Sequence, residues 1–179
     1  MKKIREYIFY NVLKWKIVGD TNFVKKCIII AAPHTHWSDF FIAIFARSLF
    51  DNKNVYFIGK KELFAFPLKY FMNWLGGMPV NRNSNSNSVD LIADLFNQNE
   101  SFILALSPEG TRKKVSSWKT GFYYIAKKAN VPIYSVALDF ENKQIKVFNP
   151  FIITGNIDND ITHLRSLYKG VKGKIPEYS

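Results

Sequence analysis

The sequence has little cysteine, few acidic residues and no long apolar run. Its 179 residues include one cysteine, Cys27, which excludes an internal disulfide and most cysteine-based metal sites and suits a reducing compartment. Fourteen Asp and Glu residues stand against 25 Lys and Arg, a net charge of +11. The longest apolar runs, 27–33 and 40–46, fall far short of the roughly 20 residues of a membrane-spanning helix. We therefore expect one non-spanning domain that meets a polyanion, either nucleic acid or an anionic membrane surface.

Aromatic residues, in contrast, are abundant, with 16 Phe, 9 Tyr and 4 Trp. Apolar residues make up 47% and charged residues 22% of the chain, a globular composition that excludes disorder and a coiled coil. The aromatic residues gather in apolar clusters such as FFIAIF and LFAFPLKYFMNW, which is typical of core or lipid-facing positions. This distribution favours a membrane over a nucleic acid, although a basic nucleic-acid-binding module stays the alternative. For the aromatic segment 62–76 we expect ordinary packing rather than an acyl tunnel.

The first 20 residues are predicted to form an amphipathic helix. Ile4, Ile8, Val12 and Trp15 recur at helical spacing and share one face. Such a helix either docks on a membrane surface or closes over the domain's own core. Charged and polar residues interrupt its apolar part, which excludes a secretory signal. Cations surround the apolar face and are candidates for contact with lipid headgroups: Lys2, Lys3, Arg5, Lys14 and Lys16.

Strand-like and helix-like segments alternate along the rest of the chain. This alternation predicts a single-domain α/β sandwich with a mixed, centrally parallel sheet, preceded by the amphipathic helix. In such sheets the ligand crevice lies at the carboxyl ends of the strands, so the loops after the strands should carry the chemistry. Strands are expected at 27–32, 54–59, 78–80, 101–107, 131–138 and 144–150, and helices at 38–49, 62–76, 89–98 and 118–130.

The loop after the first of these strands reads PHTHWSD and contains two of the three histidines. One interpretation is a metal-dependent hydrolase with His34 and His36 as ligands, but zinc needs three or four protein ligands and the remaining histidine, His163, is distant in sequence. The other is a dyad in which Asp39 orients His34 as a general base. A lone His-x-x-x-x-Asp is a common pattern, so the loop by itself decides nothing.

Two further loops contain candidate anion-binding residues. The strand at 101–107 runs into PEGTRKK, where the guanidinium of Arg112 and the N–H groups of the turn could bind a phosphate. The segment GGMPVNR ends a short strand with Arg82, which could share the same crevice. Taken singly, each segment is equally consistent with a surface turn.

Taken in order, these segments resemble the glycerolipid acyltransferase family typified by 1-acylglycerol-3-phosphate acyltransferases. PHTHWSDF matches the family's His-x-x-x-x-Asp block, GGMPVNR the second block and SPEGTR the third, while VPIYSVAL resembles the fourth. WKTGFYYIA also looks like the family's segment between the third and fourth blocks. The resemblance covers about 27–138, the motif-bearing core of a single domain 1–179. Two positions depart from the family pattern: His36 replaces a Ser or Asn, and Ser107 replaces a Phe.

The resemblance implies a role for each matching residue. His34, oriented by Asp39, would deprotonate the acceptor hydroxyl, which attacks an acyl thioester directly, with no acyl-enzyme and no metal or other cofactor. Arg82 and Arg112 would hold the acceptor's phosphate, and Glu109 and Gly110 would shape the pocket for its glycerol part. Two more residues complete the expected substrate-binding set: Thr111 and Lys119. No role is assigned to His36.

The resemblance also implies the partners of the reaction. The donor would be acyl-CoA or acyl-carrier protein, and the acceptor a lysophospholipid. Lysophosphatidate, which would give phosphatidate, is the default acceptor, and an amino-acid-containing lysolipid is the alternative. We expect no nucleic-acid partner and a peripheral position on the cytoplasmic face of a membrane, with the basic N-terminal segment against the anionic surface.

Overall fold

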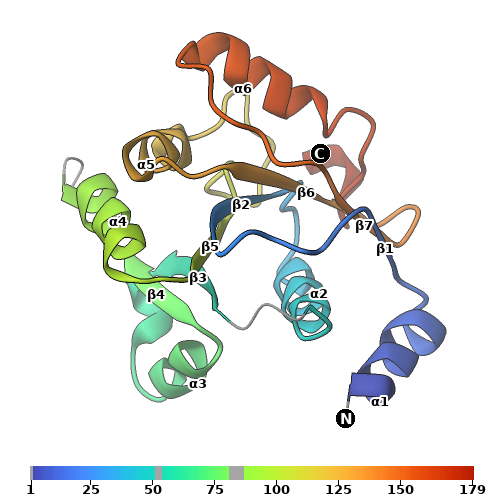
Figure 1. Ribbon diagram of the computed structural model, residues 1–179. Helices are drawn as coiled ribbons and strands as arrows, with labels where there is room; N and C mark the ends of the chain where they lie inside the picture. Colours follow the sequence, from blue (N-terminus) through green and yellow to red (C-terminus); the bar gives the residue numbers. More distant parts are fainter. Residues whose placement is uncertain (1, 51–53, 81–86) are drawn as a thin grey trace.

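The computed structural model describes residues 2–50, 54–80 and 87–179 (Figure 1). A sheet of seven strands forms its centre, in the spatial order β1-β7-β6-β2-β5-β3-β4. The strands are β1 (Lys16–Val18), β2 (Lys26–Ala32), β3 (Val55–Lys60), β4 (Gly77–Val80), β5 (Phe102–Leu106), β6 (Ile133–Asp139) and β7 (Gln144–Val147). The helices are α1 (Lys2–Tyr7), α2 (Ser38–Arg47), α3 (Leu68–Trp74), α4 (Asn87–Gln98), α5 (Gly121–Ala129) and α6 (Ile157–Ser166). Three short helices complete the fold: η1 (Ile8–Val12), η2 (Lys61–Phe64) and η3 (Pro176–Tyr178).

The five strands from β6 to β4 are parallel, and β7 pairs antiparallel with β6. The predicted mixed, centrally parallel sheet is therefore confirmed. Because β2 and β5 are adjacent and parallel, with Ile28 opposite Leu104, their carboxyl ends meet at one edge of the sheet. The motif PHTHWSD begins in the loop after β2, and the loop after β5 contains the motif PEGTRKK.

Helices cover both faces of the sheet, as expected for buried parallel strands. Successive residues of β2 point to opposite faces: Cys27 and Ile29 pack beneath η1 and α2, and Ile28 and Ile30 pack beneath α4, α5 and α6. Figure 1 shows α1, α2 and α3 on one side of the sheet and α4, α5 and α6 on the other. Burial raises the pKa of the Cys27 thiol to about 12, so this cysteine is a core residue without reactive thiolate.

The N-terminal segment differs from the expected single helix over residues 1–20. Helical structure ends at Val12, and the chain then enters β1, which pairs with β7. The residue that joins this segment to the core is Phe9, which is fully buried and stacks on Phe45 of α2 at 5.8 Å between ring centroids. Ile4 and Val12, expected on the buried or lipid-facing stripe, are 65% and 61% exposed. Trp15 is buried, but in the short segment between η1 and β1 rather than on the helix.

The aromatic segment 62–76 is also different from the expectation. It consists of η2 and α3 instead of one helix. Met72 and Leu75 are buried, whereas Phe66, Tyr70 and Trp74 are largely exposed, so the expectation of ordinary packing is wrong for these three aromatic side chains. Among the described residues, no helix has the length and apolar composition needed to cross a membrane.

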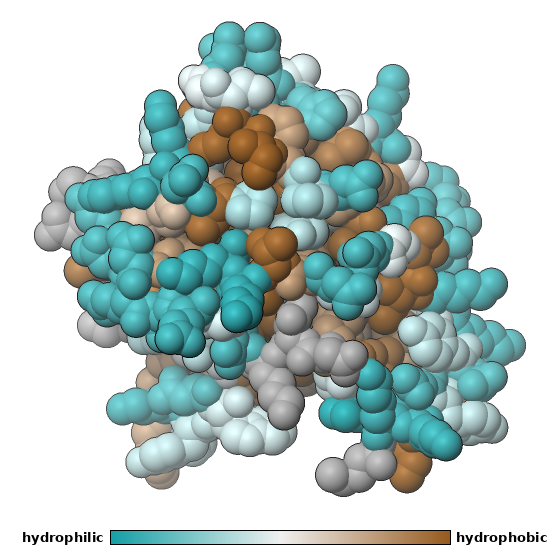
Figure 2. All heavy atoms as spheres, viewed as in Figure 1, coloured by the Kyte–Doolittle hydropathy of each residue, from teal (hydrophilic) through white to brown (hydrophobic). Residues whose placement is uncertain are grey.

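The C-terminal part of the chain adds elements that the sequence pattern did not indicate. Asn156 caps the N-terminus of α6, accepting a hydrogen bond from the N–H of Asn159. Asp160 is buried, and burial alone would raise its pKa, but hydrogen bonds from Thr154 and the Tyr123 hydroxyl outweigh burial and lower it. The bond from Tyr123 of α5 joins that helix to α6. Figure 2 shows the same view in space-filling form, with hydrophilic side chains covering most of the margin.

Candidate active site

His34 in the loop after β2 lies beside Asp39, which is in the first turn of α2. Nδ1 of His34 is 3.2 Å from Oδ2 of Asp39, whose side chain is buried, while the imidazole stays about one-quarter exposed. The same oxygen accepts hydrogen bonds from the backbone N–H groups of Thr35 and His36, both at 2.7 Å. Asp39 follows these residues by only three to five positions, so its carboxylate reaches the preceding loop and joins the loop to α2. Since Oδ2 is an acceptor here, Nδ1 carries the proton and Nε2 keeps a free lone pair.

His36 has its own partner, Ser38, at the start of α2. Its Nδ1 lies 2.9 Å from the hydroxyl of Ser38 and accepts the backbone N–H of Ser38 at 3.2 Å. With Nδ1 as the acceptor, the neutral ring has its proton on Nε2. The two histidines therefore have opposite tautomers, and only His34 offers a basic Nε2.

Glu109 reaches the same loop from the end of the neighbouring strand. Its Oε2 accepts a hydrogen bond from the backbone N–H of His34 at 2.7 Å and a longer one from the hydroxyl of Ser107 at 3.5 Å. Burial raises the pKa of the Glu109 carboxyl, although the bond from His34 acts in the opposite direction. The sheet order explains the contact, because β5, which precedes Glu109, lies directly beside β2. Glu109 thus joins the two loops at this edge of the sheet.

The turn after Glu109 packs against the segment before α5. Gly110 has a φ of +67°, and a Cβ there would lie 3.3 Å from Cγ of Lys119, so this position favours glycine. The backbone N–H of Lys119 donates to the carbonyl of Pro108 at 2.8 Å. Thr111, Arg112 and Lys119 are exposed. The motifs SPEGTR and WKTG therefore form one surface beside His34.

The structure thus places each expected site residue as follows. It brings His34, Asp39 and Glu109 into direct contact and packs Gly110 against Lys119. Thr111 and Arg112 lie exposed on the loop that begins at Glu109, without a described contact to His34. Arg82 lies outside the described residues.

The chain matches the family model described as Acyltransferase over residues 14–139. It belongs to the acyltransferase family. The family match confirms the resemblance to acyltransferases on which the site residues were chosen, and it identifies the protein as an acyltransferase.

A solved structure supports the fold of the acyltransferase. The 1-acyl-sn-glycerophosphate (LPA) acyltransferase PlsC from Thermotoga maritima aligns with 95% of this chain and 76% of its own, with a TM-score of 0.65 and 19% sequence identity. A comparison with curated proteins finds no match. At this identity the likeness to PlsC concerns the fold.

The C-terminal segment of the acyltransferase contacts the loop between β2 and α2, a contact that sequence reasoning missed. The hydroxyl of Thr35, whose residue is 2% exposed, accepts the backbone N–H of Ile175 at 3.1 Å. A Cβ on Gly173 would lie 2.6 Å from Cγ2 and Oγ1 of Thr35, so the two backbones approach more closely than any side chain at 173 would allow. No local pattern could have indicated this contact, because the partners are about 140 residues apart.

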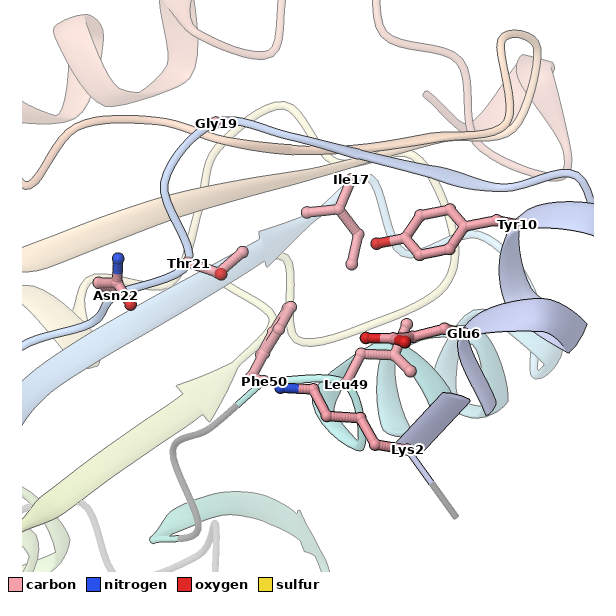
Figure 3. A pocket seen from close by; sticks show the side chains of 9 residues that line it. All are labelled: Lys2, Glu6, Tyr10, Ile17, Gly19, Thr21, Asn22, Leu49 and Phe50. Carbon is pink, nitrogen blue, oxygen red and sulfur yellow. The ribbon is translucent and has the colours of Figure 1, made fainter. Parts of the chain in front are cut away.

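Two other features of the described residues lie apart from this arrangement. No group of three or more His, Cys, Asp and Glu side chains in the described ranges is placed to hold a metal ion. A pocket of about 300 Å³ lies between α1, the loop after β1 and the end of α2, lined in part by Glu6, Tyr10, Thr21 and Phe50 (Figure 3). None of the site residues predicted from the sequence is among the residues that line this pocket.

Proposed function

We propose that the protein is a lysophospholipid acyltransferase that moves a fatty acyl group from acyl-CoA or acyl-carrier protein to a free lipid hydroxyl. The acceptor we favour is 1-acylglycerol-3-phosphate, which gives phosphatidate. The observation that carries the proposal is the contact of His34 with buried Asp39, at the edge of the sheet that also presents Glu109. The name of the T. maritima neighbour, an LPA acyltransferase, supports the choice of acceptor.

In the proposed reaction His34 acts as the general base. Its Nε2 takes the proton of the acceptor hydroxyl while that oxygen attacks the thioester carbonyl carbon. The tetrahedral intermediate collapses, the C–S bond breaks, and the imidazolium returns its proton to the leaving thiolate. Asp39 keeps the ring in the reactive tautomer and stabilises the imidazolium. The proposal needs no metal and no cofactor besides the thioester co-substrate.

The acceptor's phosphate is assigned to the cations of the surrounding loops. Arg112 offers a planar pair of N–H donors suited to phosphate oxygens, and it is exposed on the loop that begins at Glu109. Arg82 is proposed as the second cation of this site. Thr111 and Lys119 are proposed to complete the substrate-binding surface, because they flank the same turn.

The lipid acceptor requires the protein to work at a membrane surface. We propose that residues 2–16 dock there, on the cytoplasmic face. Ile4, Tyr7 and Val12 are exposed and unused by the core, while Phe9 fixes the segment to α2. Exposed cations accompany these apolar side chains: Lys2, Lys3, Arg5, Lys14 and Lys16. Apolar insertion with cations at anionic headgroups is the usual form of interfacial binding.

The test is a mass-spectrometric screen of the purified protein against a panel of lysolipids, with acyl-CoA and acyl-carrier protein as donors. Phosphatidate formed from 1-acylglycerol-3-phosphate is the expected product. Acylation of an amino-acid-containing lysolipid alone would correct the acceptor, and no acylated product from any pair would overturn the proposal.

His34→Ala should abolish turnover without unfolding the protein. His163→Ala is the matched control, because His163 is exposed on α6, away from the dyad. Turnover that survives in His34→Ala would remove the proposed base.

A further inference from the structure

The segment from Phe66 to Trp74 exposes three large aromatic side chains at a spacing of four residues. Phe66, Tyr70 and Trp74 are 84%, 71% and 78% exposed. Tyr70 and Trp74 are one turn apart on α3 and so lie on the same side of the helix. Leu68 and Phe71 beside them are about half exposed, and Phe71 lies 6.2 Å from Trp74 between ring centroids. These side chains form one aromatic surface, here called the α3 surface.

The α3 surface is not the outer side of an ordinary amphipathic helix. The inner side of α3 is already apolar, since Met72 is buried beneath it. Between Phe66 and Trp74 the only charged residue is Lys69. A short helix that is apolar on both sides normally has a partner on each, and exposed apolar patches of this kind mark interaction sites.

The α3 surface belongs to the same helical layer as α1 and α2. Nη1 of Arg47, at the end of α2, donates to the carbonyls of Val55 and Leu75, at 2.9 and 2.6 Å. On the other side of α2, Phe45 stacks on Phe9. Helix α2 therefore lies between the N-terminal segment and α3, and Figure 1 shows the three helices along one side of the sheet.

The start of α2 adds exposed aromatic side chains next to the catalytic loop. Trp37 and Phe41 are both more than half exposed and lie 5.6 Å apart between ring centroids. Trp37 also contacts the ring of His36. Exposed apolar groups therefore occur on all three helices of the layer, from residues 4–12 across α2 to α3.

The chemistry of this layer identifies its partner. Trp and Tyr are the residues enriched at membrane–water interfaces, and Lys is the cation that can extend from an inserted helix to the headgroups. Tyr70, Trp74 and Lys69 provide this combination on α3, and the N-terminal segment provides five further cations against one acid, Glu6. The charge of the layer is thus complementary to an anionic surface.

We propose that the α3 surface is a second membrane-docking element, which inserts Phe66, Tyr70 and Trp74 into the interface of an anionic bilayer. This inference rests on the proposed function, which supplies the reason for lipid contact. With residues 2–16 on one side of α2 and α3 on the other, the protein makes two attachments to the bilayer. Two attachments fix its orientation and keep the start of α2, beside His34, at the lipid surface.

The test compares binding of two triple variants to vesicles. Phe66→Ser/Tyr70→Ser/Trp74→Ser should bind vesicles of phosphatidylglycerol and phosphatidylcholine at least about ten-fold more weakly than the wild type. The matched control, Leu91→Ser/Tyr124→Ser/Ile152→Ser, removes exposed apolar groups from the opposite side of the molecule and should bind like the wild type. Circular dichroism and thermal unfolding establish that both variants are folded. Equal binding of the two triple variants would overturn the proposal.

A second measurement uses the wild-type protein and does not depend on the folding of the triple variant. Lipids brominated near the headgroup should quench tryptophan fluorescence in the wild type, and Trp74→Phe should remove a large part of that quenching. Quenching that is unchanged in Trp74→Phe contradicts insertion of this residue. Sedimentation without lipid tests the competing occupant: a wild-type dimer that the α3 triple substitution converts to a monomer would make the surface a contact between copies and overturn the proposal.

Activity measurements separate this inference from the proposed function. The α3 triple variant should lose acylation of an acceptor embedded in vesicles and keep acylation of a short-chain acceptor dispersed as monomers. Equal activity of this variant and the wild type on both acceptors would overturn the docking role. If no lysolipid is acylated by the wild type but vesicle binding still requires the three aromatic side chains, the proposed function fails and the docking surface stands.

Discussion

Oε2 of Glu109 accepts the backbone N–H of His34 at 2.7 Å, although the two residues are 75 positions apart. The bond fixes the backbone of the proposed base from the loop after β5, whereas Asp39 fixes the imidazole from the first turn of α2. Resemblance to the family implied that Glu109 shapes the acceptor pocket. The geometry supports an additional structural role, because the carboxylate ties the loop after β5 to the loop after β2.

Replacing Glu109 tests this role. Glu109→Ala leaves the N–H of His34 without its acceptor, so we expect kcat to fall by about ten-fold or more as the base loses its orientation. Glu109→Gln keeps a carbonyl oxygen in the same place and should retain much more activity. Steady-state kinetics on the two variants provide the comparison. Equal losses in both would show that the charge of Glu109, rather than its hydrogen bond, matters.

The raised pKa of Glu109 predicts a pH dependence of stability. Burial raises the pKa of Glu109 in the folded protein above the ordinary value of 4.5, which applies to the unfolded chain. At a pH between 4.5 and the raised pKa, the folded protein therefore binds more protons than the unfolded chain. The free energy of unfolding contributed by this group therefore falls as pH rises through that interval, and it is constant below 4.5. Urea unfolding at a series of pH values should show this decrease in the wild type relative to Glu109→Gln. Parallel curves for the two proteins would contradict the shift.

Asp39→Asn tests the orientation of His34. The amide oxygen can still accept hydrogen bonds from the backbone N–H groups, but the amide has no negative charge to stabilise the imidazolium. We therefore expect kcat to fall by about 10²–10⁴-fold. The protein should stay folded, since the side-chain volume is unchanged. Kinetics with the acceptor at saturation measure the effect. Near wild-type kcat would exclude a role for the dyad.

The resemblance to the family, rather than the spacing in the loop alone, singled out His34 and Asp39, and the alternation of strand-like and helix-like segments predicted the parallel centre of the sheet. The apolar runs in β2 and β5 indicated these two strands individually. The contacts of Glu109 with His34 and of Ile175 with Thr35 depend on strand order and on the path of the C-terminus, which no local pattern encodes.

At the N-terminus, the apolar pattern predicted one helix over residues 1–20, but pairing between strands ends the helix earlier. Lys14 adopts a left-handed conformation, with a φ of +59°, and the N–H of Lys16 donates to the carbonyl of Lys143 at 2.9 Å. Pairing of β1 with β7 therefore ends the helix before Trp15.

For the segment 62–76, an apolar pattern could not distinguish a buried side from an exposed one.

Arg112→Gln tests the proposed phosphate contact. Loss of a guanidinium that binds the acceptor should raise the KM for a phosphate-bearing lysolipid by about ten-fold, with a smaller change for the acyl donor. Lys127→Gln, which removes an exposed cation from the end of α5, is the control. An unchanged acceptor KM in Arg112→Gln would remove Arg112 from the site.

Gly173→Ala tests the contact between the C-terminal segment and the loop between β2 and α2. The added methyl group would lie 2.6 Å from the side chain of Thr35, so the buried loop must move, and we expect a loss of about 1–3 kcal/mol in the free energy of unfolding. Because Thr35 adjoins His34, kcat should fall as well. Gly121→Ala is the matched control: a Cβ there has no neighbour within 4 Å, so its stability should be close to that of the wild type. The measurements are the free energy of unfolding in denaturant and kcat of both variants. Equal values for the two would show that the C-terminal segment does not hold the loop of Thr35 in place.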